Sequence, residues 1–357
     1  MSDRADSALA RAFVTLRYAL EAAVFFAVVG FFGLFPLDAA SAIGGWCGRA
    51  LLSRTYLSGR ARENLAAAYP ELTPGERDTI LREMWDNLGR IVAEYAHLGE
   101  LSIGGALPRI ALAGLENLHD ASAAGKGIIC ISAHFANWEV LPLAAAQYGV
   151  DGSAVYRPVN NPFVDRWLVR QRQINGPKEQ IAKGAQGMRR IFTLLRARKA
   201  IFMLVDQKTN EGVAAPFFGR DAMTTPAAAA LALKLGAVLL PISNERLHGA
   251  RFRVTAHPAL DFAPSGDHAR DVLALTVRIN EAIETCVRYR PSQWLWIHRR
   301  WPKTGERPRS RRGRHAQEFA KPPDNSGTLV EDASPVVSRY AASNGRQSPE
   351  NPGPSST

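Results

Sequence analysis

The chain has 357 residues, 46% of them hydrophobic, so it can bury one large core. Lys and Arg total 44 against 33 Asp and Glu, and the net charge of +11 favours an anionic partner: nucleic acid, an anionic membrane surface or an acidic protein. The cysteines, Cys47, Cys130 and Cys286, form no CxxC or Cys/His cluster, which argues against a metal site or a disulfide framework and favours a reducing compartment.

An uncharged stretch at residues 22–37 contains five phenylalanines and ends beside Pro36. It is shorter than the roughly 20 residues that cross a bilayer comfortably. Three interpretations therefore compete: an uncleaved membrane anchor, a buried core helix, and a signal peptide cleaved near residues 40–42. Acidic residues offset the arginines before the stretch, which disfavours a signal peptide, and arginines on both sides favour a helix that dips into one leaflet. We predict an N-terminal segment, residues 1–40, with a membrane anchor.

Residues 60–100 have the periodicity of helices, with a start signal at Thr73-Pro74. From Gly127 onward, short β-rich runs alternate with helical ones. The expected strands are 128–133, 153–156, 200–205, 237–243 and 251–262, and the expected helices are 137–149, 184–199, 224–236 and 271–290. This alternation predicts an α/β fold with a mostly parallel mixed sheet flanked by helices, in a domain that spans residues 41–303.

The last part of the chain has a different composition. From residue 304 it is rich in Pro, Ser, Gly, Asn and Arg and has few apolar clusters. Such a segment cannot offset the entropy lost on ordering, so we predict a disordered basic tail at residues 304–357.

Residues 127–140 read GIICISAHFANWEV, a strand-forming run that ends at His134 and reaches Glu139 at the start of a helix. Sites in parallel α/β sheets form beyond the carboxyl ends of strands. The simpler alternative is a histidine that caps a strand and a glutamate that favours a helix N-terminus. If the pair is catalytic, Glu139 accepts a hydrogen bond from one ring nitrogen while the other removes a proton from an attacking hydroxyl. No G-x-S-x-G elbow is present and Cys130 is expected in the core, so direct transfer is favoured over a covalent enzyme intermediate.

Several motifs in order resemble one enzyme family. His134 and Glu139 match the H-x4-D/E box of the glycerolipid acyltransferase superfamily, and SAHFANWE resembles the late acyltransferases of lipid A biosynthesis. Further matches are VYRP (155–158), VDQ (205–207), APFFGR (215–220), LPI (240–242) and QWLWIHRRW (293–301), so the resemblance covers roughly residues 10–303. It implies a glycerolipid-acyltransferase-like fold and catalytic roles for His134 and Glu139.

The resemblance also implies substrate-binding residues. Arg157 matches an arginine that engages the acceptor or stabilises developing charge, with a solvated surface arginine as the alternative. Asp206 lies where the glycerol-phosphate branch of the superfamily has the motif F-P-E-G-x-R. This chain lacks the arginine of that motif, which weakens the case for a glycerol-3-phosphate acceptor. Phe217 and Phe218 are expected to wall an acyl groove, with plain core as the alternative. Within the box, Asn137 is expected to bind substrate. Ala136 replaces a glycine that is common in the family.

An enzyme of this kind transfers an acyl chain from acyl carrier protein to a hydroxyl group of a lipid A precursor at the inner membrane. The resemblance therefore implies these partners, with the acyl carrier protein thioester as co-substrate and no cofactor or metal. Both partners are anionic, which fits the net charge. One alternative is an acyltransferase for another membrane lipid such as a phosphatidylinositol mannoside. A distant one is a polyanion-binding protein acting through the basic run at residues 307–314, without specific nucleic-acid recognition.

Overall fold

The computed structural model describes residues 2–301, with side chains from residue 13 onward. The chain divides into two units, Met1–Ser310 and Arg311–Thr357, and the described residues all belong to the first. The predicted tail and its basic run, residues 304–357, lie outside the described residues.

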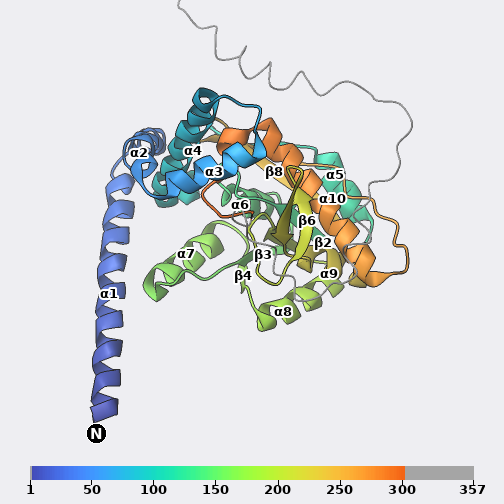
Figure 1. Ribbon diagram of the computed structural model, residues 1–357, viewed down its shortest axis with the longest axis horizontal. Helices are drawn as coiled ribbons and strands as arrows, with labels where there is room; N and C mark the ends of the chain where they lie inside the picture. The colour runs from blue at the N-terminus through green and yellow to red at the C-terminus, as the bar shows by residue number, and fades with distance from the viewer. Residues whose placement is uncertain (1, 302–357) are drawn as a thin grey trace, which may run out of the picture. The chain divides into compact units, whose positions relative to one another are not determined.

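A seven-stranded sheet forms the centre of the fold (Figure 1). Its strand order is β1-β9-β8-β2-β5-β3-β4. Every neighbouring pair is parallel except β8 and β9, which are antiparallel. This confirms the predicted mostly parallel mixed sheet. The strands are β1 (Ile110–Ala113), β2 (Ile128–Ser132), β3 (Gly152–Tyr156), β4 (Glu179–Ala182), β5 (Ala200–Leu204), β8 (Val238–His248) and β9 (Arg251–Ala256).

Helices surround the sheet. They are α1 (Ser2–Gly33), α2 (Leu37–Ala50), α3 (Leu57–Ala68), α4 (Pro74–Glu94), α5 (Leu115–Ala123), α6 (Val140–Gln147), α7 (Pro162–Asn175), α8 (Ala185–Arg196), α9 (Ala227–Leu235) and α10 (His268–Tyr289), with short 3-10 turns η1 (Leu52–Arg54), η2 (Tyr95–Glu100) and η3 (Pro291–Gln293). The predicted start of α4 is confirmed, because Thr73 and Glu76 form a reciprocal capping box ahead of it.

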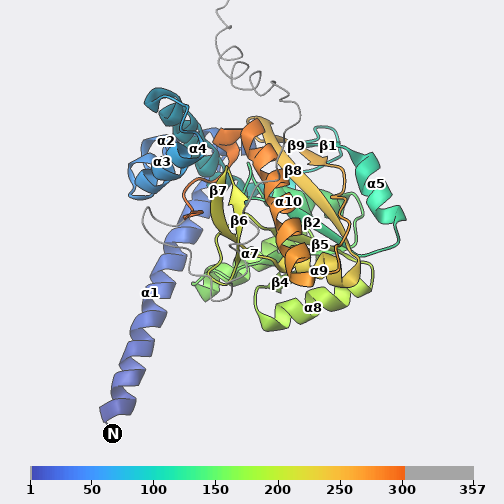
Figure 2. The ribbon, with the colours of Figure 1, turned by 45° about the vertical axis from the view of Figure 1, so that its right-hand side comes forward.

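The central strand β2 is buried on both faces, which explains its unbroken apolar sequence. Ile129 and Ile131 pack into a core cluster with residues of α3, α4, α8, α9 and α10. Ile128 and Cys130 point to the other face and pack with residues of α5 and α6. Figure 2 shows α10 crossing in front of the strands on the first face. The expected core position of Cys130 is confirmed, and burial raises the pKa of its thiol to about 12.

The N-terminal helix is longer than the uncharged stretch suggested. Within α1, the 21 residues Phe13–Gly33 are apolar enough to cross a membrane and lie mostly exposed, so the core-helix alternative is wrong. The sequence underestimated the length of the apolar segment because Arg17 and Glu21 interrupt it. These two residues pair with each other one turn apart, with 3.4 Å between Arg17 Nε and Glu21 Oε1. At 1.5 Å per residue, 21 residues span about 32 Å, which matches a hydrocarbon core of roughly 30 Å.

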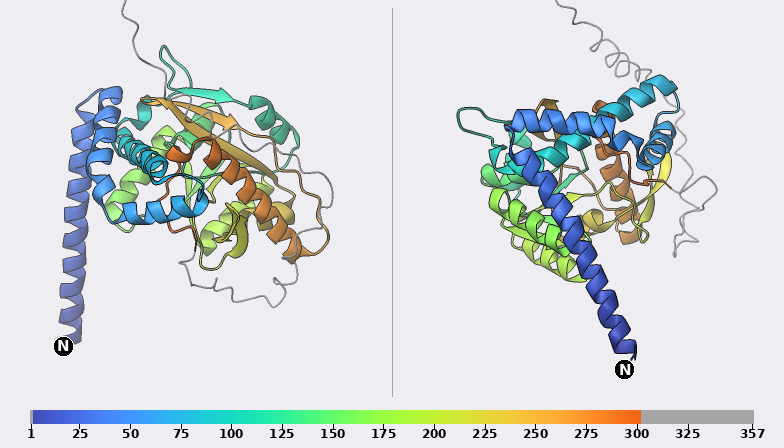
Figure 3. Two further views of the ribbon diagram at one scale, coloured as in Figure 1. Left: turned by 45° about the horizontal axis from the view of Figure 1, so that its top comes forward. Right: turned by 90° about the vertical axis from the view of Figure 1, so that its left-hand side faces the viewer.

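The end of α1 is attached to the folded body, whereas its N-terminal part projects away as a single helix (Figure 3). Asn161, at the start of α7, donates to the carbonyl of Tyr18 (2.8 Å), and the Trp167 ring packs edge-on against Phe25. His97 Nε2 donates to the carbonyl of Phe32 (3.1 Å). The apolar helix is therefore fixed to the same elements that surround the site described below.

Candidate functional site

A cavity of about 300 Å³ lies at the carboxyl ends of four parallel strands. Four lining residues lie within three residues of the ends of these strands: His134 after β2, Arg157 after β3, Lys183 after β4 and Gln207 after β5. The position expected for His134 is thus confirmed. Because the loops after parallel strands converge at one edge, residues about 70 positions apart in sequence meet here.

His134 is paired with Asp206. The ring Nδ1 of His134 lies 2.8 Å from Asp206 Oδ1, and the His134 backbone N–H donates to Oδ2 of the same carboxylate (3.0 Å). Trp294 Nε1 also donates to Oδ2 (2.8 Å). Burial opposes the charge of this carboxylate, but the contacts with His134 and Trp294 outweigh it and hold the pKa of Asp206 well below its usual range. A carboxylate on Nδ1 fixes the tautomer that leaves Nε2 as the acceptor.

Two sequence-based expectations need correction here. Asp206 was expected to bind substrate, but it is 4% exposed and its oxygens are occupied by protein donors beneath the ring. Glu139 was expected to accept from the His134 ring, but in the described residues Asp206 takes that position. Asp206 follows β5 two residues past its end, as His134 follows β2, and the two strands are neighbours. Sequence alone does not give this neighbour relation.

Glu139 is buried in a different ion pair. Its carboxylate accepts two hydrogen bonds from the Arg172 guanidinium on α7 (2.8 and 2.6 Å) and one from the Tyr95 hydroxyl (2.8 Å). Burial opposes ionisation, but Arg172 and Tyr95 outweigh it and lower the pKa of the Glu139 carboxyl. Glu139 therefore ties the end of the histidine loop to α7 and η2.

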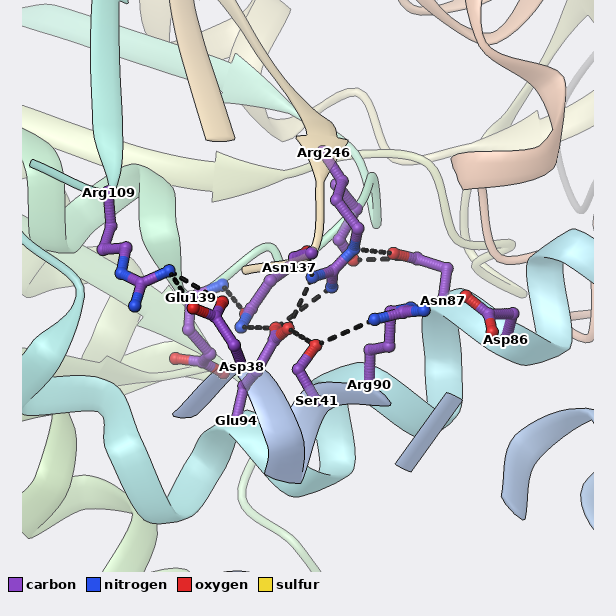
Figure 4. Close-up of polar contacts among 12 residues, drawn as sticks. Asp38, Ser41, Asp86, Asn87, Arg90, Glu94, Arg109, Asn137, Glu139 and Arg246 are labelled. Carbon is purple, nitrogen blue, oxygen red and sulfur yellow. Dashed lines mark hydrogen bonds and ion pairs between the residues drawn. The ribbon is translucent and has the colours of Figure 1, made fainter. Parts of the chain in front are cut away.

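The histidine loop, residues 133–139, also rests on a buried polar network (Figure 4). Asn137 donates to Glu94 (3.0 Å), a carboxylate with no exposed surface that also receives hydrogen bonds from Arg246 and from Ser41 of α2. Asn244 donates to the Asn137 carbonyl (2.6 Å). Asn137 is 1% exposed, so the expectation that it binds substrate is wrong: its side chain holds the loop in place.

Ala136 in this loop has a φ of +42°, in the left-handed region. An L-residue with a Cβ is disfavoured there by roughly 1–2 kcal/mol, whereas glycine is not. Its backbone is held by Gln293, whose carbonyl accepts from the Ala136 N–H (2.8 Å), and by Asn87, which donates to the Ala136 carbonyl (3.2 Å). The geometry explains why glycine suits this position of the box.

Gln207 and His298 complete the polar wall beside His134. The Gln207 side-chain amide nitrogen lies 3.3 Å from His134 Nε2 and 3.2 Å from His298 Nε2. Burial lowers the pKa of His298 to about 4, and the nearby His134 acts in the same direction. The His298 ring is therefore neutral near pH 7, and the Gln207 amide can donate to both imidazoles. The VDQ and QWLWIHRRW motifs pointed to these segments, but not to these two side chains.

The aromatic pair of the APFFGR motif lies elsewhere. Phe217 ends β6 (Val213–Phe217), Phe218 and Gly219 form the turn with positive φ, and β7 (Arg220–Thr224) returns antiparallel. Phe217 is 1% exposed and Phe218 6%. Their rings pack in a buried aromatic cluster with Tyr69, Trp294, Trp296 and Trp301. The expectation that they wall an acyl groove is wrong, because Phe217 and Phe218 are not among the described residues that line the cavity beside His134.

The inner part of the cavity is apolar. Cys130, Leu141, Phe202 and Ile242 line it between α6 and the sheet, and the same four residues also line a second, apolar cavity of about 40 Å³ toward α5. The two cavities therefore share a wall. A polar mouth with an apolar interior suits a molecule with a reactive polar end and a hydrocarbon chain.

Metal ligands do not gather at this site. Among residues 13–301, no group of three or more His, Cys, Asp and Glu side chains could hold a metal ion.

Comparison with known proteins places the chain among lipid-modifying enzymes. Residues 8–303 match the family described as bacterial lipid A biosynthesis acyltransferase. The lipid A biosynthesis lauroyltransferase of Escherichia coli K12 is 27% identical over 273 residues, which cover 71% of this chain and 83% of that protein. The palmitoleoyltransferase of the same organism is 26% identical, covering 70% and 81%. A phosphatidylinositol mannoside acyltransferase of Mycobacterium tuberculosis H37Rv is 24% identical, covering 67% and 76%.

Proposed function

This chain belongs to the family of bacterial lipid A biosynthesis acyltransferases and is an acyltransferase, and we propose that it acylates a hydroxyl group of a lipid A precursor with a fatty acyl chain from acyl carrier protein. The observation that carries the proposal is the His134–Asp206 pair at the mouth of a cavity with an apolar interior. We also assign the fold to the glycerolipid acyltransferase type.

The proposed reaction uses the ring nitrogen of His134 that Asp206 does not contact, Nε2. The acceptor hydroxyl attacks the thioester carbonyl carbon as His134 Nε2 takes its proton. The tetrahedral intermediate collapses to an O-ester, and the leaving thiolate takes the proton back from the imidazolium. Asp206 holds the ring and stabilises its protonated form, so Asp206 acts here as the orienting carboxylate. No enzyme nucleophile takes part.

Gln207 has a place in this scheme. Its amide donates to His134 Nε2 in the absence of substrate, and the acceptor hydroxyl must replace it there. The released amide N–H then lies beside the reacting carbon, where it can donate to the developing oxyanion. Glu139 has an indirect role: its contacts with Arg172 and Tyr95 fix the loop that carries the histidine.

The acyl chain is placed in the apolar part of the cavity. The shared wall of Cys130, Leu141, Phe202 and Ile242 would contact its methylene groups, each of which gains about 0.8 kcal/mol on burial. The donor and acceptor meet at the mouth, and α1 anchors the enzyme to the cytoplasmic face of the inner membrane, where the acceptor lipid lies.

The test uses the purified full-length protein in mixed micelles. It is incubated with thioesters of acyl carrier protein and a tetra-acylated lipid A precursor, and the products are identified by mass spectrometry. We expect each product to gain the mass of one fatty acid less one water, which is the gain for one acyl group replacing a hydroxyl hydrogen. Incorporation into a phosphatidylinositol mannoside, with none into any lipid A precursor, would instead support the second candidate function suggested by the mycobacterial relative.

A further inference from the structure

Two cationic side chains at the mouth of the cavity have no acidic partner. Arg157 and Lys183 both line it, and among the described residues neither has a carboxylate within ion-pairing distance or a side-chain hydrogen bond. The third cation that lines the cavity, Arg172, is paired with Glu139. Unpaired cations at the entrance to a cavity are the usual means of attracting an anionic ligand.

The two cations leave the backbone side by side. β3 and β4 are parallel neighbours whose last paired residues are Tyr156 and Ala182, and the Lys183 N–H donates to the Tyr156 carbonyl (2.9 Å). Neighbouring strands lie about 4.8 Å apart, so Arg157 and Lys183 start from adjacent positions. Partial desolvation and the nearby Arg157 lower the pKa of Lys183, while Asp206 opposes the shift.

The surrounding protein does not neutralise this pair. The only carboxylate among the described residues that acts on Lys183 from nearby is Asp206, which is already committed to His134 and Trp294. On the opposite wall, His298 is neutral, and Arg60 of α3 lies close enough to lower the pKa of His298 further. The entrance therefore has an excess of positive charge.

We propose that Arg157 and Lys183 together bind a phosphate group of one of the two substrates. The planar guanidinium of Arg157 suits two phosphate oxygens, and Lys183 supplies a compact charge. The inference rests on the proposed function, because both expected substrates carry phosphate: the acceptor as a phosphorylated glycolipid, and the donor in the phosphopantetheine arm of acyl carrier protein. The chemistry that the two substrates share is a phosphate ester, which would bind at the entrance of the cavity that His134 also lines.

The test compares Arg157→Gln, Lys183→Gln and the double variant with Lys126→Gln. Lys126 is exposed in the turn before β2, at the opposite end of the sheet, so this control removes the same charge away from the cavity. KM and kcat are measured for the full-length protein with four substrate pairs. These combine a phosphorylated or enzymatically dephosphorylated acceptor with an acyl thioester of phosphopantetheine or of pantetheine.

We expect each single variant to raise KM about 5- to 20-fold for the substrate whose phosphate occupies the site, with little change in kcat. If the increase disappears with the dephosphorylated acceptor, the phosphate is that of the acceptor. If it disappears with the pantetheine thioester, the phosphate is that of the donor. The control is expected to match the wild type throughout.

Two outcomes would overturn the proposal: unchanged KM in the double variant with every pair, or an equal loss with phosphate-bearing and phosphate-free pairs. Inorganic phosphate titrated into the protein and followed by NMR gives a measurement independent of turnover. We expect the double variant to lose the weak binding that the wild type and the Lys126→Gln control retain, and binding retained by the double variant would contradict the site. Transfer by the wild type to the phosphate-free pair tests the proposed function separately.

Discussion

Asp206 and Glu139 are both buried carboxylates, one beneath the His134 ring and one at the end of the histidine loop, yet their partners differ in kind. Asp206 accepts from the ring and backbone of His134, so it acts on the residue that faces the cavity. Glu139 accepts from Arg172 and Tyr95, so it joins the loop to neighbouring elements. The glutamate of the H-x4-E box therefore contributes to the architecture of the site, and the orienting carboxylate comes from a strand end 72 residues away from the histidine.

The largest effect on turnover is expected from substitutions of His134 and Asp206. We predict that His134→Ala lowers kcat at least ~10²-fold, the usual scale for loss of a general base. Asp206→Asn, which keeps the shape but removes the charge, is expected to lower kcat by a similar factor with KM nearly unchanged. The double variant is expected to lose little more than either single variant, because the two residues act as one unit. Fully additive losses in single-turnover measurements would contradict a His134–Asp206 unit.

The second prediction concerns the loop side. Glu139→Leu leaves the Arg172 guanidinium buried without its counter-charge, and we expect it to lower the free energy of unfolding by about 3–5 kcal/mol. Adding Arg172→Met removes the stranded charge, so the double variant is expected to recover most of that loss in urea denaturation. Recovered stability with recovered turnover would identify Glu139 as a positioning residue. Recovered stability with turnover still reduced by more than ~10²-fold would show that the carboxylate acts on the reaction itself.

The sequence predicted some parts of this site much better than others. A doubly buried strand such as β2 has an unbroken apolar run, so the place of His134 at a strand end was predictable. The Asp206 contact depends on β2 and β5 being neighbours, which is a property of strand order and not of either strand's sequence. Phe217 and Phe218 were misplaced because a groove for hydrocarbon and a protein core select the same side chains.

Polar elements were missed for a related reason. The helix α7, which carries Arg172, and the edge strand β4, which precedes Lys183, have few buried positions and hence a weak hydrophobic pattern. Both contribute charged residues to the cavity. Charged residues at the rim of the cavity thus come in part from elements with few buried positions, which hydrophobic patterns do not reveal.

A third, smaller effect is a pH dependence of the free energy of unfolding that we attribute to His298 in the cavity wall. His298 has a pKa of about 4 in the folded protein against roughly 6.5 when unfolded, so the unfolded chain alone takes up a proton between these values. Stability is therefore expected to fall by roughly 1–3 kcal/mol as the pH decreases from 6.5 to 4. We predict that His298→Gln flattens this part of the profile, whereas His248→Gln at an exposed position does not. Parallel profiles for wild type and His298→Gln in chemical denaturation would contradict the neutral buried ring.

The smallest effect is expected at Ala136, in the histidine loop between His134 and Glu139. Replacing it by glycine relieves the left-handed strain, worth about 1–2 kcal/mol, but loses a buried methyl group of about 0.8 kcal/mol and adds about 0.5–1 kcal/mol of unfolded-state entropy. These contributions nearly cancel, so we predict that Ala136→Gly changes stability by less than about 1 kcal/mol and retains turnover.

Two matched variants make this last prediction decisive. Ala133→Gly, in the same loop and equally buried but without a positive φ, lacks the strain relief and is expected to cost about 1–2 kcal/mol. Ala136→Val places a β-branched side chain at positive φ and is expected to cost more than about 2 kcal/mol and to lower kcat, because the loop must shift His134 relative to Asp206. If Ala136→Gly is as destabilising as Ala133→Gly in urea titrations, packing of the methyl group and not backbone conformation determines the residue preferred at this position of the box.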